Sequence, residues 1–396
     1  MLKIIDLQAA EDSRDIVHRT VQALVEGQVV GVPTETSYVL AAHALCEASV
    51  AQLYELAEPT VNHTESDSRE IATFELSLRS REAAFDFLGN NCDTARRLAQ
   101  RCWPGPLTME TRCDQPFSAL SQLPQAVQKL LCSGSDDNLA SDHHWFRFRV
   151  VNNDILDQIH RYLSAPLVLL NPPGGATNEV VATADSVLSQ YQDKLPLLLD
   201  NGPTRYGGRT TVARVNGHRW KLVREGVIER AAMNQFVKPV IALVCTGNTC
   251  RSPMGEALLR EALRKRTGSE DAVRVVSAGV AAGAGSGASP QAVAVMGRRG
   301  LDLTGHSSRP LDESVMNVAD LVLTMTAGHR AAILAAWPEM HDRVFTLRRD
   351  GGDISDPVGM TIEVYQACAD QIDAELGKWL DSLGDDFFPE CESVSE

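Results

Sequence analysis

The chain of 396 residues lacks a long hydrophobic run and lacks an excess of positive charge. No apolar stretch approaches the ~18 residues that a helix needs to span a bilayer, which argues against a membrane protein. The sequence has 37 Lys and Arg against 52 Asp and Glu, a formal net charge of −15. This balance argues against a protein held to nucleic acid by bulk charge, although it allows a local basic groove.

An export signal and a second metal-binding pair are also missing. Acids follow Met1–Asp6 quickly, which is not the pattern of a signal peptide. We therefore expect a cytoplasmic protein whose nine scattered cysteines are mostly reduced thiols. Cys245 and Cys250 have no Cys or His pair nearby to complete four ligands, so no metal site is expected.

The hydrophobic pattern predicts an α/β protein with two domains and a tail: residues 1–236, residues 237–384 and an acidic tail at 385–396. From Val240 onward strands alternate with helices, which predicts parallel βαβ units. In this part we expect a strand from Val240 to Cys245 and further strands at 273–277, 320–325 and 343–347. We expect helices at 253–266, 290–299, 327–336 and 361–382. Residues 231–239 are expected to be a linker, and 278–289 a mobile loop.

The most informative segment is the run at 240–254. An apolar, β-branched stretch ends in Cys245, Arg251 follows, and Ser252 and Pro253 suggest a helix start. A cysteine attacks as thiolate, and backbone N–H groups at a helix start and a guanidinium favour that anion. The segment therefore predicts a phosphate-binding loop with a thiol at its base.

Each loop residue has an expected task. Arg251 offers a planar fork for two phosphoryl oxygens, and Asp356 is the candidate acid for the leaving group. Gly247 is expected to supply unusual backbone angles, Asn248 to bond across the loop, and Ser252 to bond the thiolate and cap the helix. The phosphate-binding set is Thr246, Gly247, Asn248, Thr249, Cys250 and Ser252. A chance Cys-x5-Arg spacing or a pair of core thiols is the structural alternative.

Together with Val276–Gly279, His306–Arg309, Ala319–Met325 and Asp356–Pro357, this run resembles the low-molecular-weight protein tyrosine phosphatase family over about 239–383. The resemblance implies a Rossmann-like parallel sheet and a phosphorylated protein as substrate. It implies that Cys245 forms a phosphocysteine, that Arg251 stabilises the transition state, and that Asp356 protonates the leaving group and then activates water. It implies no metal and no cofactor.

Within this resemblance the substrate depends on Thr249. Phosphotyrosine-type members usually carry an apolar residue there and aromatic residues around the cleft. Here Val358 follows Pro357, and 281–288 contains no ring to stack on a phenol. Thr249 and the Asp353–Met360 segment look more like the protein arginine phosphatase branch. Phosphoarginine is therefore favoured over phosphotyrosine, with a neutral variation at Thr249 as the alternative.

Cys250 is a candidate redox residue. In the resembled family a neighbouring cysteine can form a reversible disulfide with the nucleophile and shield it from over-oxidation. The alternative is a buried structural thiol.

The first domain resembles the YrdC/YciO family over about 1–230. The resemblance rests on Gly31–Leu40, Trp103–Thr108, Gly202–Pro203, Thr210–Val212 and Val223–Ile228. It implies a twisted α/β sheet with a large basic cavity. It also implies synthesis of L-threonylcarbamoyladenylate from threonine, bicarbonate and ATP, for tRNA modification.

This domain departs from the family pattern where phosphates would bind. Tyr54–Pro59 stands in place of a Lys-x-Arg-Pro motif, no Lys or Arg lies between Val50 and Arg69, and a Ser-Ala-Asn element is reduced to Leu169–Asn171. The candidate ligand contacts that remain are Thr34, Thr36, Arg149 and Thr210. The alternative is that these strand-end and turn residues only form hydrogen bonds with the backbone nearby.

We therefore expect a degenerate domain that binds another ligand or serves as a docking or structural module. ATP with Mg²⁺ is expected only if this domain is active, and RNA or a nucleotide is a candidate partner. The alternative function is a threonylcarbamoyladenylate synthase with an accessory phosphatase.

Overall fold

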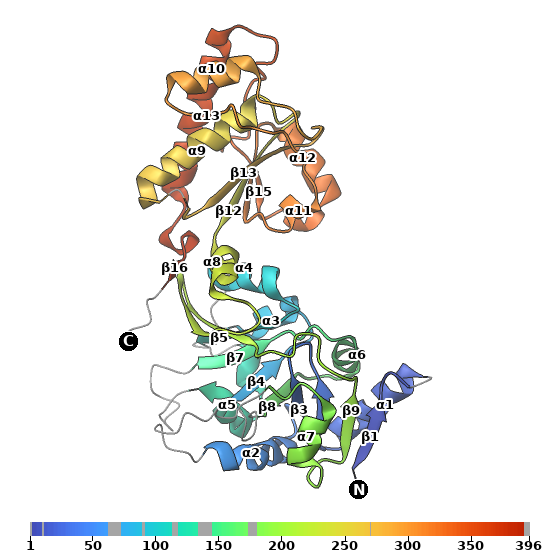
Figure 1. The fold of residues 1–396 in the computed structure, drawn as a ribbon. Coiled ribbons are helices and arrows are strands. Elements are labelled where there is room, and N and C mark those ends of the chain that lie inside the picture. Colours follow the sequence, from blue (N-terminus) through green and yellow to red (C-terminus); the bar gives the residue numbers. More distant parts are fainter. Residues whose placement is uncertain are drawn as a thin grey trace. The chain divides into compact units, whose positions relative to one another are not determined.

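The computed structural model describes residues 2–9, 12–61, 73–88, 92–112, 118–133, 145–172, 180–269 and 271–391, except for the side chains of 58–61 and 133. The chain forms two compact units (Figure 1). Unit 1 comprises Met1–Phe236 and Glu390–Glu396, and unit 2 comprises Val237–Pro389. Among the described residues, no helix combines the length and the apolar character that crossing a membrane requires.

Unit 1 is built on a mixed sheet. Among the described residues its strands run in the order β1-β9-β2-β3-β8-β4-β7-β5-β10-β11-β16, with β6 beside β7. The strands are β1 Lys3–Asp6, β2 Val30–Pro33, β3 Tyr38–His43, β4 Thr73–Ser77, β5 Leu107–Arg112, β6 Cys132–Ser133, β7 Trp145–Arg149, β8 Leu167–Asn171, β9 Leu197–Asp200, β10 Thr211–Asn216, β11 Arg219–Arg224 and β16 Glu390–Cys391. The helices are α1 Ser13–Val25, α2 Glu47–Val61, α3 Arg81–Phe87, α4 Asp93–Cys102, α5 Gln125–Leu131, α6 Asp154–Tyr162, α7 Ala184–Tyr191 and α8 Arg230–Val237.

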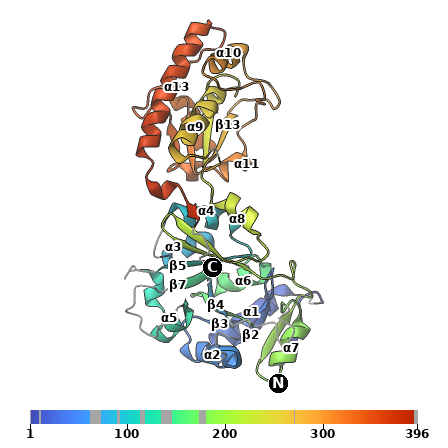
Figure 2. The same ribbon diagram turned by 60° about the vertical axis from the view of Figure 1, so that its left-hand side comes forward.

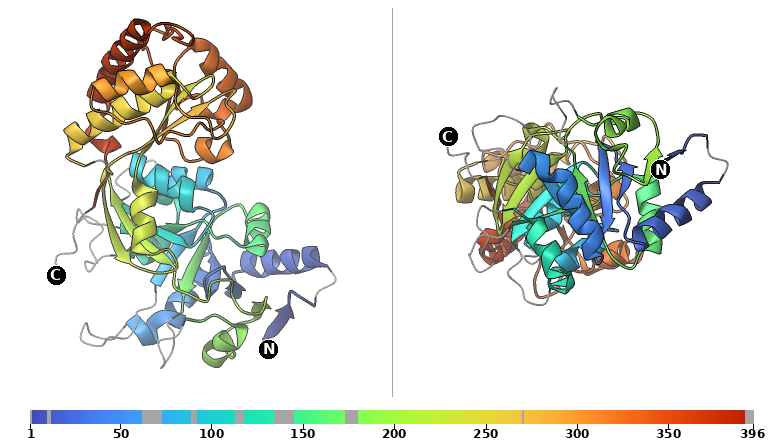
Figure 3. Two further views of the ribbon diagram at one scale, coloured as in Figure 1. Left: turned by 45° about the horizontal axis from the view of Figure 1, so that its top comes forward. Right: turned by 90° about the horizontal axis from the view of Figure 1, so that it is seen from below.

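The amphipathic helix α1 shows how the sheet of unit 1 is covered. Its side chains Ile16, Val17 and Leu24 are buried and belong to one core cluster with residues of β2, β3, β8 and β9. Asp12 caps the helix by accepting a hydrogen bond from the Arg14 N–H. Figure 3 shows α1 from two further sides. The expected α/β sheet of the first domain is thus present.

Unit 2 has a parallel sheet, as the alternation of strands and helices predicted. The order is β13-β12-β14-β15, and every pair in it is parallel. The strands are β12 Val240–Cys245, β13 Arg274–Gly279, β14 Leu321–Thr324 and β15 Val344–Thr346. The helices are α9 Arg251–Thr267, α10 Pro290–Arg298, α11 Glu313–Met316, α12 Ala327–Ala336 and α13 Ile362–Ser382.

Alternation along β12 sorts its side chains into two layers. Ile241, Leu243 and Cys245 belong to a core cluster with side chains of α9, α10 and α13. Val240, Ala242 and Val244 belong to a second cluster with side chains of α11 and α12. Successive strand side chains point to opposite faces, so a strand covered on both sides is apolar throughout. Figure 2 shows α9 and α13 side by side on their face of the sheet.

The expected linker at 231–239 is mostly helical. Residues 230–237 form α8, which buries Met233 and Val237. The Phe236 carbonyl accepts a hydrogen bond of 2.6 Å from Arg101 Nη1. The division between the two units falls inside this segment, between Phe236 and Val237, as a linker there predicts. Its helical form was not predicted, because a short apolar segment stabilises a helix only once it packs on a neighbour.

The expected acidic tail at 385–396 is partly folded. Residues 385–387 form a 3-10 helix, and Phe387 is buried in the unit 2 core. Phe388 lies edge-on to Phe387 and beneath the Arg266 guanidinium. Glu390 and Cys391 then pair in parallel with β11 of unit 1. Two aromatic rings and one strand pair therefore order part of the segment that was expected to be an acidic tail. Residues 392–396 lie outside the described part of the chain.

Candidate active site

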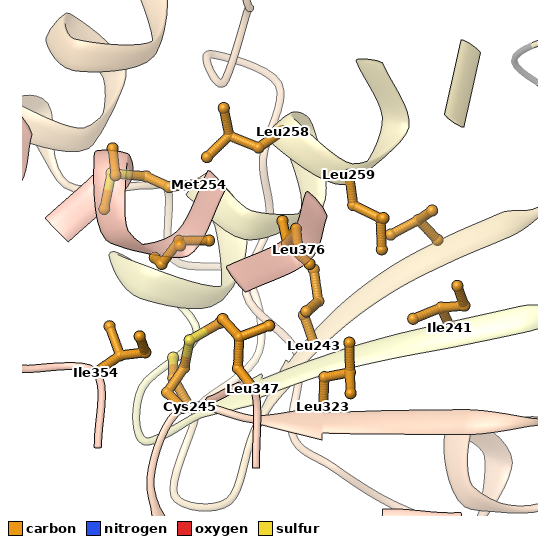
Figure 4. Packing of buried hydrophobic residues seen from close by; sticks show 14 of the residues in the cluster. Ile241, Leu243, Cys245, Met254, Leu258, Leu259, Leu323, Leu347, Ile354 and Leu376 are labelled. Atoms are coloured by element: carbon orange, nitrogen blue, oxygen red, sulfur yellow. The ribbon is translucent and has the colours of Figure 1, made fainter. Parts of the chain in front are cut away.

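The predicted loop lies at the carboxyl end of the central strand β12. Cys245 is the last residue of that strand and is buried, and α9 begins at Arg251. Figure 4 shows Cys245 near Leu347 and Ile354 at this end of the sheet. Ligands of parallel α/β sheets bind outside the carboxyl ends of the strands, where the loops leave room for them.

Two groups contact the Cys245 sulfur. Ser252 Oγ lies 2.9 Å from Sγ, and the Asn248 N–H donates to Sγ over 3.3 Å. Ser252 is inside the first turn of α9, and Cys250 is the N-cap residue, without a side-chain capping bond. The prediction that Ser252 bonds the sulfur agrees with this geometry, whereas the prediction that it caps the helix was wrong. Its hydroxyl is directed to the thiol and to Asn248 instead.

Asn248 carries the strained backbone of the loop. Its φ of 52° makes it the single non-glycine residue with positive φ in the described part of the chain. Its side chain donates to Ser252 Oγ over 3.0 Å and accepts from the Arg309 N–H over 2.9 Å, and its carbonyl lies 2.7 Å from His306 Nε2. These bonds offset the cost of the left-handed conformation.

Gly247 was expected to provide the unusual backbone angles, and this expectation was wrong. It is not among the residues with positive φ, and a Cβ added to it would meet nothing closer than Thr249 Oγ1 at 3.7 Å. Asparagine tolerates left-handed angles through local side-chain hydrogen bonds, so the next residue takes that task.

Arg251 and Asp356 come together although 105 positions separate them. Arg251 is buried, and its Nη2 donates to Asp356 Oδ2 over 2.6 Å while its Nη1 donates to the Ile354 carbonyl over 3.1 Å. Arg251 Nη2 also lies 3.4 Å from Thr246 Oγ1. The Asp356 side chain is 44% exposed, so its carboxylate also faces solvent. The guanidinium is therefore fixed while the carboxylate stays accessible.

Part of the expected mobile loop at 278–289 is attached to the phosphate-binding loop. The Val280 and Ala281 N–H groups donate to the carbonyls of Cys245 and Thr246, and the Ser289 N–H donates to the Thr249 carbonyl. Ser308 Oγ donates to the Gly283 carbonyl over 2.6 Å. These backbone bonds hold the two loops in one arrangement.

Three side chains near the site were missed by the sequence reasoning. His329 Nε2 lies 2.9 Å from Thr246 Oγ1, and Tyr365 Oη lies 3.3 Å from Cys250 Sγ. Burial and the hydrogen bond with Cys250 raise the pKa of Tyr365 to about 12. Burial raises the pKa of Cys368 to about 12, and its thiol faces the Ser355 carbonyl at 3.7 Å. His329 lies on α12, whereas Tyr365 and Cys368 both lie on α13. All three are far from the loop in the sequence, so no local signal identifies them.

The four candidate residues of unit 1 also come together, and all four are buried. Arg149 donates over 2.9 Å to Thr210 Oγ1 and, through Nη2, over 2.9 Å to Thr36 Oγ1. Thr36 Oγ1 lies 3.1 Å from Thr34 Oγ1 and 3.3 Å from Thr210 Oγ1. Strand ends of β2, β7 and β10 thus meet around one guanidinium.

Two glutamates that the sequence reasoning missed complete this cluster. Arg149 Nη2 lies 3.0 Å from Glu35 Oε1, and Nη1 lies 3.3 Å from Glu75 Oε1. Glu75 also accepts a hydrogen bond of 2.6 Å from Thr108 Oγ1. Burial alone would lower the pKa of Arg149, but the two carboxylates outweigh it and raise that pKa. The cluster therefore holds two carboxylates against one cation.

No group of three or more His, Cys, Asp or Glu suited to a metal ion occurs in the part of the chain that the structure describes. Of the stretch between Val50 and Arg69, which has no Lys or Arg, residues 62–68 and the side chains of 58–61 lie outside that part.

Comparisons with known proteins agree with this division into two units. Residues 240–387 match the family model "Low molecular weight phosphotyrosine protein phosphatase". Residues 22–226, more than half of the 396 residues, match the Sua5/YciO/YrdC family model, described as "Telomere recombination".

Curated relatives match unit 2 over nearly their whole length. A protein-arginine-phosphatase of Geobacillus stearothermophilus is 41% identical over 36% of this chain and 95% of its own. One of Bacillus subtilis is 41% identical over 34% of this chain and 91% of its own. The probable low molecular weight protein-tyrosine-phosphatase EpsP of Ralstonia solanacearum is 37% identical over 35% of this chain and 92% of its own.

The chain is thus an α/β protein phosphatase of the cysteine-dependent type, with a second domain before it. It belongs to the low molecular weight phosphotyrosine protein phosphatase family through residues 240–387 and to the Sua5/YciO/YrdC family through residues 22–226. Both family resemblances of the sequence are confirmed.

Gly279 gives a test of the loop geometry. It ends β13 beside Cys245, and an added Cβ would lie 2.4 Å from the Thr246 carbonyl oxygen and 2.9 Å from the Asn248 nitrogen. We expect Gly279→Ala to displace the loop and lower kcat/KM on p-nitrophenyl phosphate roughly 100-fold, because misplacement by about 1 Å has effects of that order.

Gly283→Ala is the matched control, since a Cβ there meets no heavy atom within 4 Å. It should keep the parent kcat/KM. Equal activity of both variants would show that the close contact at Gly279 does not shape the loop.

Proposed function

We propose that unit 2 removes phosphate from phosphoarginine in proteins, by way of a phosphocysteine on Cys245. The observation that carries the proposal is a hydroxyl at Thr249 in the loop, beside a rim of residues 280–288 and 357–360 that contains no Phe, Tyr or Trp. The exposed large hydrophobic residues of that rim are Val280, Val358 and Met360. Tyr365 is a nearby ring, but it is buried with its hydroxyl against Cys250.

The proposed reaction begins when the Cys245 thiolate attacks phosphorus and the bond from phosphorus to the guanidine nitrogen breaks. The Asn248 N–H and the Ser252 hydroxyl stabilise the thiolate, and Arg251 binds equatorial phosphoryl oxygens. Asp356 gives its proton to the leaving guanidine nitrogen. In the second step Asp356 takes a proton from water, the water oxygen bonds to phosphorus, and the bond from sulfur to phosphorus breaks.

In the free site Arg251 Nη2 is paired with Asp356 Oδ2 at 2.6 Å. A phosphoryl dianion competes for the same donor, so substrate binding would release Asp356 from its cation. The Asp356 carboxyl group would then be free to turn from the guanidinium toward the leaving group.

Two features support arginine over tyrosine. A phenol gains from stacking on a ring, and the rim of this site offers valine and methionine side chains instead. A guanidinium gains from a nearby carboxylate, and Asp353 is exposed in the same short loop as Asp356. The identity of 41% with two proteins named as protein-arginine-phosphatases, against 37% with one named as a tyrosine phosphatase, favours the same assignment.

Thr249→Ile tests the substrate. We expect the ratio of kcat/KM for phosphoarginine to that for phosphotyrosine to fall about tenfold, since the hydroxyl is lost and an apolar wall is gained. The same assay on Cys245→Ser should give no turnover of either substrate.

Thr304→Ile makes the same substitution at an exposed residue outside the loop and should keep the parent ratio. An unchanged ratio in Thr249→Ile would remove the basis for choosing arginine. Turnover that survives Cys245→Ser would instead overturn the phosphocysteine route.

We also propose that Cys250 protects the nucleophile from oxidation. Peroxide would oxidise the Cys245 thiolate to a sulfenic acid, and the Cys250 thiol would displace its oxygen as water and form a disulfide. Peroxide inactivation should then be fully reversed by dithiothreitol in the parent and be largely irreversible in Cys250→Ser. Cys391→Ser, at an exposed thiol of unit 1, is the control. Full recovery of Cys250→Ser would refute this role.

For unit 1 we propose a structural or docking role without adenylate synthesis. A bound polyphosphate needs free cations, whereas both terminal nitrogens of the Arg149 guanidinium are already paired with Glu35, Glu75 and two threonines. The cluster as a whole holds two carboxylates against one cation, so it does not fit the phosphates of ATP with Mg²⁺. A phosphorylated protein is the proposed partner of the chain, and RNA or a nucleotide remains a candidate only for other surfaces of unit 1.

The assay for unit 1 uses the full-length Cys245→Ser chain, so that phosphatase activity does not consume products. With ATP, Mg²⁺, bicarbonate and threonine, we expect no pyrophosphate release that depends on threonine. Threonine-dependent pyrophosphate would establish the synthase reading, in which the phosphatase is the accessory domain.

A further inference from the structure

The helix α12 places a histidine against the phosphate-binding loop. Thr326 caps the helix by accepting a hydrogen bond from the His329 N–H, and the Asp353 carboxylate accepts another from the Ala327 N–H. These two bonds fix the backbone at the first turn of α12. Its Nδ1 lies 2.9 Å from Thr326 Oγ1, and its Nε2 lies 2.9 Å from Thr246 Oγ1. Either tautomer of a neutral ring can make both hydrogen bonds.

Thr246 needs such a partner. It is exposed at the mouth of the site, so neighbouring side chains do not fix its rotamer by packing. Its hydroxyl lies between two groups, His329 Nε2 at 2.9 Å and Arg251 Nη2 at 3.4 Å. The histidine bond selects the rotamer in which the oxygen faces the guanidinium.

The environment keeps the histidine neutral at pH 7. Burial and the Arg251 charge lower the pKa of His329, while Asp353 and Asp356 act in the opposite direction with smaller effect. The position in the first turn of α12 acts in the same direction as burial, because a helix N-terminus disfavours a cation. A neutral ring adds no second positive charge beside Arg251.

We propose that His329 is a positioning residue for the phosphatase reaction. It holds Thr246, and Thr246 holds the Nη2 end of the Arg251 guanidinium, while the Ile354 carbonyl binds the Nη1 end. This inference rests on the proposed role of Arg251 in stabilising the transition state. The chain of contacts runs from α12 through the loop to α9, so one helix outside the Cys-x5-Arg segment sets the fork that binds phosphoryl oxygens. His329 itself does not touch the reacting atoms.

The test compares His329→Leu with Thr246→Val, each of which removes one end of the same hydrogen bond. We expect each to lower kcat on p-nitrophenyl phosphate about tenfold with little change in KM, because a misplaced Arg251 is felt most in the transition state. The inhibition constant of orthovanadate, which mimics that state, should rise about tenfold, whereas that of inorganic phosphate should change less than threefold.

Coupling separates positioning from a structural role. The double variant should be no slower than the slower single variant, and His329→Gln, whose amide reaches Thr246, should recover most of kcat. His341→Leu, at an exposed histidine of the same unit, is the control. The proposal would be overturned if the losses of kcat in the two single variants multiplied in the double variant. It would also be overturned if the variants lost thermal stability but kept the parent kcat. If the parent itself does not turn over p-nitrophenyl phosphate, the proposed function fails instead.

Discussion

The phosphatase unit depends on stabilising one sulfur at the end of a buried strand. Ser252 Oγ and the Asn248 N–H contact the Cys245 sulfur, and the Asn248 side chain ties itself to the same serine. This small ring of bonds forces Asn248 into the left-handed region, and contacts from Arg309 and His306 hold it there. The loop is thus strained locally and fixed by segments about 60 positions away, as a preorganised anion site requires.

The two units show opposite uses of a buried arginine. Arg251 has one carboxylate partner, and that carboxylate is half-exposed, so an incoming phosphate can take its place. Arg149 has two carboxylate partners that are as buried as itself, together with two threonine hydroxyls. Separating such a cluster would leave charges buried without partners, which costs several kcal/mol. The first arginine is therefore available for chemistry, and the second stabilises the meeting point of β2, β4, β7 and β10.

Much of the architecture of unit 2 was predictable because its signals are local. The apolar run of β12, the proline in the first turn of α9 and the long amphipathic α13 each follow from neighbouring residues. Prediction failed where an element depends on a distant partner. Helix α8 forms on the strength of two buried side chains, and residues 385–391 are ordered by Arg266, Phe387 and the edge of β11. Composition alone does not indicate such partners.

By itself the sequence determined the class of chemistry. Few functions other than phosphate transfer use a Cys-x5-Arg loop, here Cys245 to Arg251, together with a distant Asp-Pro pair. The sequence also showed that Tyr54–Pro59 contains no lysine or arginine, which predicts weak binding of a polyphosphate at that segment. Only the tertiary structure decided which residue bears the loop strain, Asn248 rather than Gly247, and that Glu35 and Glu75 occupy Arg149. It alone brought His329 to Thr246 across 83 positions. Sequence spacing fixes what a segment can form, whereas side-chain partners from separate elements meet only when the sheet and its helices pack.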